Sequence, residues 1–218
     1  FGGEGGAVAH SSSLDDLFFS LPLLGIVFRI EDDGTLTRVA GGGADPDAAV
    51  ATPDADHAVA AGLLDFAQRS RLLTDGPDGN ISVRAADGLW CTPRQVAKDT
   101  VTAEQLVKVR PDLHTRTHRF DGGKPSIDAT VAAWLYRQLP ELRGLVHFHD
   151  ALALPTATTE HPLPCGCIEE AEEIHRALSS AAAAGDLQDD WLVRLAHHGW
   201  LLGTTDPDAL ATRWDLPR

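Results

Sequence analysis

The sequence predicts an α/β protein whose sheet is mixed or antiparallel. Strand-like runs alternate with amphipathic helices along the chain, and several of the strand-like runs follow one another as closely as hairpins do. The chain has 218 residues, 43% of them hydrophobic, which is enough for one sizeable core. We therefore expect one main domain, residues 54–218, preceded by an N-terminal extension and linker, residues 1–53.

The extension differs from the rest of the chain in composition. Glycines cluster near both of its ends, and an Asp/Pro/Ala-rich run, residues 44–56, follows the second cluster. Inside it, residues 26–30 and 35–39 flank an Asp-Asp-Gly turn, which is the pattern of a β-hairpin. No function follows from this hairpin.

Regular periodicity begins at Asp54. Val59, Leu63 and Phe66 recur at helical spacing, and a Gly/Pro/Asp turn at residues 75–79 ends this helix. Thr102 is a suitable N-cap for a later helical turn. Short strand-like runs surround that turn, at residues 81–84, 89–92, 106–109 and 115–120.

The second half of the chain predicts two helices and two strands. A helix over residues 128–139 buries Val131, Trp134 and Leu135, and Pro140 ends it. The elements that follow are a strand at residues 144–149, a helix at residues 168–184 and a last strand at residues 191–202.

Composition excludes several classes of function. The net charge is −14, from 32 acidic and 18 basic residues, so the surface should repel nucleic acids and anionic membranes. The apolar stretch 17–28 is too short to span a bilayer, and no basic region precedes it as in a signal peptide. An odd number of cysteines, Cys91, Cys165 and Cys167, suits a reducing compartment, so we expect a cytoplasmic protein.

A His-x-His pair lies on the predicted strand 144–149. Side chains alternate along a strand, so His147 and His149 project from one face while Val146 and Phe148 project from the other. The two histidines are about 7 Å apart at Cα and can chelate one ion. Taken alone, the pair is equally typical of two half-exposed histidines.

A third ligand is available from His197 or His198, which precede Gly199. A glycine at that point allows the backbone or a ligand to approach closely. Three neutral imidazoles that leave a coordination position open are typical of a catalytic metal, with zinc favoured and iron, manganese or cobalt open. The pair Cys165 and Cys167 matches no common ligand spacing and is interpreted as incidental.

Five segments in order resemble the class II aldolase/adducin family, over about residues 54–208. The segments are Asp78-Gly-Asn-Ile-Ser-Val-Arg84, Cys91-Thr-Pro93, Lys124-Pro-Ser-Ile-Asp128, His147-Phe-His149 and His198-Gly199. The resemblance implies an α/β/α fold with a central, mainly antiparallel sheet. It also implies a C4 homotetramer with active sites between subunits, to which we expect exposed Trp191, Trp200 and Trp214 to contribute.

The resemblance also implies roles for individual residues. It makes His147, His149 and His198 the ligands of zinc or a similar divalent ion. Asp128 occupies the family's acidic position, where it would ligate the metal or move a proton; the alternative is a carboxylate that stabilises a helix N-terminus. The residues that match positions holding the substrate's anionic end are Asn80, Ser82, Thr92 and Ser126.

Three departures from the family pattern bear on the substrate. Ile127 replaces a serine, and Arg94-Gln95 stands where Ser-Gly is usual, which favours a carboxylate or neutral polar group over phosphate. Aldolases of the family take a proton donor, a tyrosine, from a neighbouring subunit, whereas the only tyrosine here, Tyr136, lies within a helix. Glu160-His161 is a possible replacement, or simply an exposed turn.

The function predicted from these features is that of a metal-dependent lyase of aldolase or decarboxylase type. It would cleave a carbon–carbon bond of a small hydroxy or keto substrate through a metal-stabilised enolate. The alternatives are an epimerase or dehydratase of the same fold, an iron-dependent oxygenase, and a non-enzymatic adducin-like module. We expect a small-molecule substrate and neither a nucleic-acid nor a membrane partner.

Overall fold

The computed structural model describes residues 27–30, 36–40, 52–112, 117–121, 123–149, 155–196 and 198–213. The helices are α2 (Ala55–Arg69), the 3-10 turn η1 (Ala103–Gln105), α3 (Ala129–Gln138), α4 (Ile168–Ala184) and α5 (Pro207–Arg213). The strands of the main sheet are β3 (Asn80–Ala85), β4 (Gly88–Cys91), β5 (Val107–Asp112), β6 (Thr117–Asp121), β7 (Gly144–Phe148), β8 (Ala157–Thr158), β9 (Asp190–Leu195) and β10 (Gly199–Thr204).

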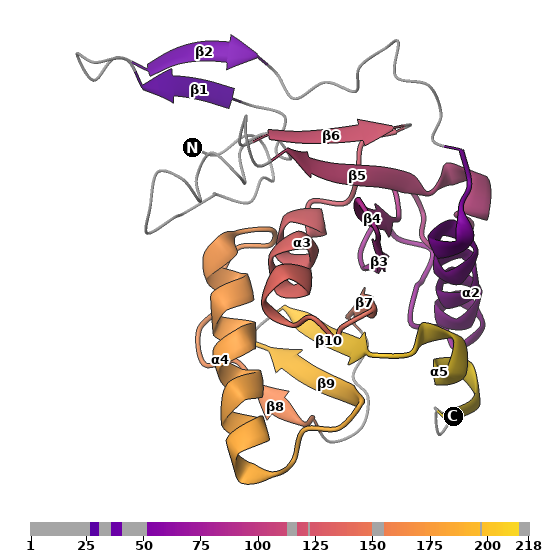
Figure 1. The fold of residues 1–218 in the computed structure, drawn as a ribbon, viewed down its shortest axis with the longest axis vertical. Helices are drawn as coiled ribbons and strands as arrows, with labels where there is room; N and C mark the ends of the chain where they lie inside the picture. The colour runs from indigo at the N-terminus through magenta and orange to yellow at the C-terminus, as the bar shows by residue number, and fades with distance from the viewer. Residues whose placement is uncertain are drawn as a thin grey trace.

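These eight strands form one sheet in the order β6-β5-β4-β3-β7-β10-β9-β8. Neighbouring strands are antiparallel except for β8 and β9, which are parallel. The predicted α/β class with a mainly antiparallel sheet is therefore confirmed. Strand β7, which carries the His-x-His pair, lies between β3 and β10 near the middle of the sheet (Figure 1).

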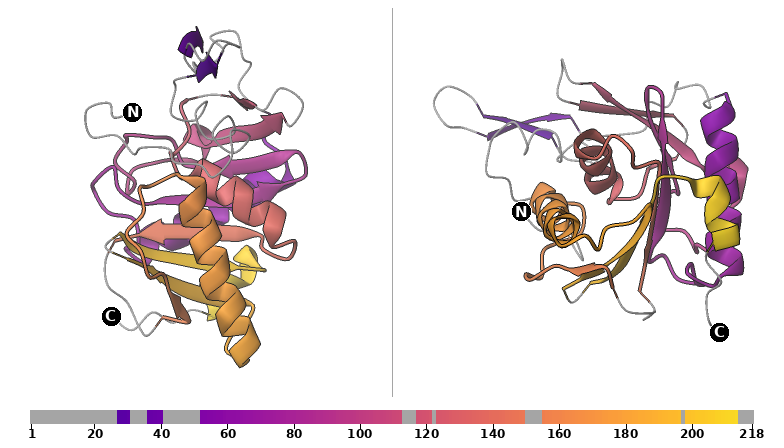
Figure 2. Two further views of the ribbon diagram at one scale, coloured as in Figure 1. Left: turned by 90° about the vertical axis from the view of Figure 1, so that its left-hand side faces the viewer. Right: turned by 60° about the horizontal axis from the view of Figure 1, so that its bottom comes forward.

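Helices cover both faces of the sheet. Helices α3 and α4 lie on one face, and α2 and α5 lie on the other (Figure 2). Each face has its own buried cluster: Leu135, Ile174 and Leu201 belong to the first, and Leu63 and Leu210 to the second. The α/β/α layering expected from the family resemblance is therefore present.

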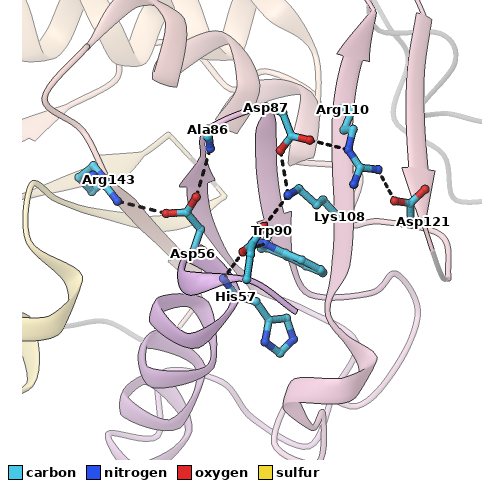
Figure 3. A network of polar contacts seen from close by, with 10 residues as sticks. Asp56, His57, Ala86, Asp87, Trp90, Lys108, Arg110, Asp121 and Arg143 are labelled. Atoms are coloured by element: carbon cyan, nitrogen blue, oxygen red, sulfur yellow. Dashed lines mark hydrogen bonds and ion pairs between the residues drawn. The ribbon is translucent and has the colours of Figure 1, made fainter. Parts of the chain in front are cut away.

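Helix α2, the first helix beside the main sheet, begins at Asp54, which caps the helix and takes part in a group of ion pairs. Asp54 Oδ1 accepts hydrogen bonds from the His57 N–H at 2.8 Å and from the Trp90 indole N–H at 3.0 Å. Its other oxygen lies 2.7 Å from Lys108 Nζ, which also pairs with Asp87 at 2.8 Å (Figure 3). The expected helix start at Asp54 is confirmed, and one carboxylate ties α2 to β4 and β5.

The predicted N-terminal hairpin is also present. Strands β1 (Val27–Ile30) and β2 (Leu36–Ala40) pair antiparallel in a sheet of their own. The Asp-Asp-Gly turn between them lies outside the described residues. The boundary placed at residue 53 between extension and main domain stays a prediction.

The last predicted strand is wrong, because residues 191–202 form two strands. β9 ends at Leu195, the chain turns back, and β10 begins at Gly199 with Gly199 paired to Leu195. The positive φ of Gly199, 97°, suits this reversal, so His198 lies in a turn and not on a strand. The short strand β8 and helix α5 were not predicted.

The expectation that tryptophans near the end of the chain are exposed is also wrong for two of them. Trp191 is 4% exposed and Trp200 is 8% exposed. Gly203 pairs with Trp191 across the two strands, and a Cβ at Gly203 would lie 2.1 Å from the indole, so the ring packs directly over the glycine. Trp200 packs in the cluster beneath α2, and Trp214 lies outside the described residues.

Within the described ranges, no helix combines the length and the apolar character that crossing a bilayer requires.

Candidate functional site

Strand β7 places the first histidine of the site on the face covered by α3 and α4. His147 pairs with Asn80 on β3 and with Leu201 on β10, so the three side chains share that face. Val146 and Phe148 belong to the opposite cluster, as the strand alternation predicted. His149 follows the end of β7, and its Nε2 lies 3.1 Å from His147 Nε2.

The third histidine reaches this pair from the β9–β10 turn. The ring of His198 lies 4.8 Å from that of His147 and 5.6 Å from that of His149, measured between centroids. One nitrogen from each ring lies within 4.8 Å of the other two, close enough to hold a metal ion. The predicted convergence of these three histidines is present, while His197 lies outside the described residues.

The close approach of the turn to β7 requires Gly199. A Cβ on that residue would lie 2.5 Å from the Phe148 carbonyl oxygen, well inside van der Waals contact. A side chain here would therefore push the turn, and His198 with it, away from the other two histidines. The sequence predicted that this glycine would let the backbone or a ligand approach closely, and in the structure it is the backbone of β7 that approaches.

His147 is held in the neutral form that ligates metals. Its Nδ1 donates a hydrogen bond to the Trp200 carbonyl at 2.9 Å, which leaves the lone pair on Nε2, the nitrogen facing His149. Burial, followed by the proximity of His198, lowers the pKa of His147 to about 4. At neutral pH this ring is therefore uncharged and available as a ligand.

His198 has different surroundings, which favour its charged form. Its Nε2 lies 2.8 Å from Cys165 Sγ, and its Nδ1 donates to Glu170 Oε1 at 2.9 Å. Hydrogen bonds with the Cys165 thiol and with Glu170 raise the pKa of His198 to about 10. A cation that binds to this ring would therefore displace a proton from it.

Asp128 supplies a carboxylate beside the histidines. It precedes α3 as the N-cap residue, yet its side chain makes no capping hydrogen bond. Oδ2 accepts a hydrogen bond from Asn80 Nδ2 at 2.6 Å, and Oδ1 is buried without a hydrogen-bond partner. Burial raises the pKa of Asp128, while His198 and the Asn80 hydrogen bond oppose that shift.

A pocket under α3 and α4 connects Asp128, His147 and His198, whereas His149 is exposed and does not line it. Its apolar wall comes from both helices and from the sheet, and includes Val131, Leu145 and Ile174. Its polar wall consists of Asn80, Ser82, Asp128, His147, Glu170 and His198. A small cavity with convergent imidazoles and carboxylates is typical of a metal or catalytic site.

Of the predicted substrate-binding residues, Asn80 and Ser82 line this pocket, and Thr92, Arg94 and Ser126 do not. Thr92 is fully buried, with its hydroxyl accepting from the Ile81 N–H at 3.3 Å, and Ser126 binds the Thr92 carbonyl through its N–H at 3.0 Å. Arg94 is half-buried, and its N–H binds the Lys124 carbonyl at 2.8 Å. These hydrogen bonds join two loops, residues 92–94 and 124–126, and the second of them directly precedes Asp128 in sequence.

The single tyrosine is accounted for by packing. Tyr136 is 4% exposed, and its hydroxyl donates to the Ser82 carbonyl at 2.8 Å and lies 3.0 Å from Ser82 Oγ. Burial raises its pKa further above the ordinary value. Glu160 and His161 are exposed, and their N–H groups bind Glu173 Oε1.

Two residues of the site were not predicted from the sequence. Glu170 and Cys165 contact opposite nitrogens of His198, although Cys165 was interpreted as incidental. A signal for Glu170 existed: it shares a helical stripe with Ile174 and Leu178, and a carboxylate on a buried stripe needs a partner. No sequence signal located Cys165.

The donor set fits a divalent cation. Three imidazole nitrogens converge, two carboxylates lie beside them, and the buried Oδ1 of Asp128 lacks a protein donor. Neutral imidazole with carboxylate is the combination that zinc, iron, manganese and cobalt accept.

Comparison with known proteins agrees with this geometry. The family model described as the class II aldolase and adducin N-terminal domain matches residues 58–213. The chain belongs to the class II aldolase and adducin family. All five segments that carried the resemblance lie within this matched range.

Class II aldolase relatives share limited identity with the chain. A probable L-ribulose-5-phosphate 4-epimerase of Mycoplasma pneumoniae is 32% identical over 89 residues, which are 40% of this chain and 36% of the relative. An L-fuculose phosphate aldolase of Haemophilus influenzae is 26% identical over 140 residues, 58% of this chain and 62% of the relative. The chain thus matches less than two thirds of either relative's length.

The fold of the family is seen in solved structures as well. YgbL of Escherichia coli, a candidate aldolase, epimerase or decarboxylase, superposes with a TM-score of 0.52 at 20% identity. The superposition covers 73% of this chain and 84% of YgbL. At this identity the likeness concerns the fold alone.

Proposed function

We propose that this chain is a metal-dependent lyase that cleaves a carbon–carbon bond of a small hydroxy or keto compound. The observation that carries the proposal is the convergence of His147, His149 and His198 beside the carboxylate of Asp128, whose Oδ1 is buried. Family membership supports a lyase or epimerase type of reaction. The polar wall of the pocket supplies groups that hold an ion and groups that move a proton.

The three histidines would hold one divalent ion, for which zinc is our first choice. Such an ion, when bound, supplies Lewis acidity that stabilises the negative charge developing beside a carbonyl as a neighbouring bond breaks. His147 is already neutral and has its Nε2 directed at His149, so part of the site is preorganised.

Asp128 is the residue to which we assign proton transfer. Asn80 fixes one carboxylate oxygen, the other is buried without a hydrogen-bond partner, and the residue lines the pocket. Burial raises the pKa of this carboxyl group, which brings it nearer to the range where an acid or base works at neutral pH. Direct ligation of the ion by the free oxygen is the other role this position permits.

We infer that the substrate carries a carboxylate or a neutral polar group at the end facing the loop pair of Thr92 and Ser126. Arg94 lies in that loop and offers a planar, bidentate cation suited to a carboxylate. Ile127 lacks the hydroxyl that would help to hold a phosphate. Asn80 and Ser82, in the pocket wall, are the proposed polar contacts nearer the ion.

We further propose a cytoplasmic homotetramer. The tetramer is proposed from the family resemblance, which implies active sites between subunits; the buried Tyr136, bonded to Ser82, does not serve as the shared donor, so another side chain would take that part. All three cysteines are free thiols, which suits a reducing compartment. A chain that light scattering shows to be a stable monomer, and that is fully active in the same solution, would contradict the shared site.

Epimerisation is the second candidate reaction. The relative from Mycoplasma pneumoniae is named as a probable epimerase. The family resemblance also implies glutamate at the acidic position in aldolases and aspartate in the related pentose-phosphate epimerases, and this chain has Asp128 there. Both reactions need the same ion-binding residues and the same carboxylate.

The test is a panel of small hydroxy and keto compounds, each offered with and without a phosphate group, to the metal-loaded protein. We expect cleavage into two carbonyl-containing products, fastest for an unphosphorylated acid. Arg94→Ala should slow that reaction by about tenfold or more, because it removes a charge-assisted hydrogen bond. Inversion at one carbon without cleavage would favour the epimerase. Faster turnover of the phosphorylated compounds, unchanged in Arg94→Ala, would refute the assignment of the substrate class.

A further inference from the structure

We propose that Glu170 is a positioning residue that orients His198 for metal binding. Its carboxylate fixes the tautomer and the rotation of the His198 ring so that Nε2 is presented to the ion. The inference rests on the metal site of the proposed function and adds a residue to it. It assigns to helix α4 a part in the site that the three histidines alone do not reveal.

The contacts of Glu170 use both of its oxygens. Oε1 lies 2.9 Å from His198 Nδ1, and Oε2 accepts a hydrogen bond from the Gly166 N–H at 3.2 Å. The side chain of Glu170 is 7% exposed and that of His198 is 16% exposed. A carboxylate held at two points and shielded from water has little freedom to leave the imidazole.

The local sequence explains why the carboxylate lies there. Cys167 is the N-cap residue of α4, so Glu170 stands in the first helical turn, where N–H groups and the helix dipole favour a negative charge. Gly166 adopts a φ of 77° and packs against the Ile127 carbonyl, which turns its N–H toward α4. The loop and the helix start together aim Glu170 at the β9–β10 turn.

The buried carboxylate of Glu170 needs a partner, so its contact with His198 is not incidental. A carboxylate removed from water loses its hydration, and this cost is offset only where the group is paired and hydrogen-bonded. His198 is the ion-pair partner of Glu170. A histidine that binds a metal through one ring nitrogen commonly donates the N–H of its other ring nitrogen to a carboxylate or a carbonyl. This hydrogen bond raises the basicity of the nitrogen that binds the metal.

His147 and His198 are then oriented in the same way. His147 donates Nδ1–H to the Trp200 carbonyl at 2.9 Å, and His198 donates Nδ1–H to Glu170. In each ring this leaves Nε2 as the nitrogen that would ligate the ion, once His198 has lost the second proton of its charged form. Cys165 Sγ lies 2.8 Å from that nitrogen of His198, so the thiol occupies the side from which the ion would bind.

The experiment compares zinc binding by the full chain and by three variants. Zinc affinity is measured by competition with a chromophoric chelator, and the visible spectrum of the cobalt-loaded protein reports the ligand environment. Glu170→Leu removes the acceptor, and Glu170→Gln keeps an acceptor without the charge. Glu173→Gln is the matched control, because Glu173 is equally buried on α4 but binds the N–H groups of Glu160 and His161.

We expect Glu170→Leu to weaken zinc binding by about 10- to 100-fold and Glu170→Gln by a smaller factor of about three to ten. The cobalt spectrum should change in both, while Glu173→Gln should match wild type in affinity and spectrum. The melting temperature of the metal-free protein identifies any loss that is only structural, since such a loss would lower it without changing zinc affinity.

Two results would overturn the inference, and they differ in what else they affect. If wild type binds zinc and Glu170→Gln binds it equally well with an unchanged cobalt spectrum, whether or not Glu170→Leu folds, the positioning role is wrong and the proposed function stands. If wild type binds neither zinc nor cobalt, the proposed function fails as well.

Discussion

At the scale of single residues, the imidazoles of the site have different surroundings, which favour the neutral form of one ring and the charged form of another. His147 is neutral because it is buried and donates to a carbonyl, whereas His198 is held near a carboxylate and a thiol that favour its charged form. The pairing of His147 with His149 could be predicted from strand alternation alone. The contacts of His198 with Glu170 and Cys165 could not, because they join a turn to residues about thirty positions away, where no local pattern operates.

A prediction at this scale concerns Asp128. Asp128→Asn should fold like wild type, because the amide keeps the size of the side chain and the carboxylate caps no helix. Turnover should fall by about 100-fold or more, as expected when a general acid or base is removed. Steady-state kinetics on the best compound of the panel, with circular dichroism as the folding control, measures both effects. Full activity of the variant would exclude Asp128 from the chemistry.

At the scale of elements, periodicity located most helices well. Helix α4 runs over Ile168–Ala184, the same bounds that the sequence predicted, because its apolar stripe is continuous and Gly185 ends it in a left-handed conformation. The failure at residues 191–202 has a physical cause. Both halves of that segment are apolar enough for strands, and the reversal between them depends on Gly199 approaching β7, a contact between distant parts of the chain.

The start of α2 gives a prediction at the element scale. Hydrogen bonds from Lys108, the His57 N–H and Trp90 outweigh the opposing effect of burial and lower the pKa of Asp54 to about 2, from its ordinary 3.8. Asp54→Ala should lower the free energy of unfolding by about 1–2 kcal/mol at pH 7, the range for loss of an N-cap. Asp54→Asn keeps a capping acceptor and should cost less.

The pH dependence of this effect follows from the sign of the shift. A carboxyl group whose pKa is depressed in the folded state stabilises the fold above its unfolded pKa and loses that contribution as pH falls through the folded pKa. The difference between wild type and Asp54→Ala should therefore be full above about pH 4 and shrink between pH 4 and pH 2. Urea unfolding at a series of pH values measures it, and a difference that stays constant across this range would contradict the account.

At the scale of the whole molecule, the sheet explains why the site forms where it does. Antiparallel pairing places β3, β7 and β10 side by side, so Asn80, His147 and Leu201 meet on one face, and α3 and α4 close over them. The class of the fold and its mainly antiparallel sheet were predictable from the sequence and its family resemblance. The burial of Trp191 was not, because it depends on a glycine in the neighbouring strand.

The measurement that tests the central claim most directly is the metal content of the purified chain. Elemental analysis after loading and desalting should find a single divalent ion per chain in wild type, and only a small fraction of that in His147→Ala, His149→Ala and His198→Ala. His175→Ala is the control, because this half-buried histidine on α4 packs against Trp134. We expect His175→Ala to retain the ion. A wild-type chain without stoichiometric metal, or a His147→Ala variant that keeps it, would contradict the site proposed here.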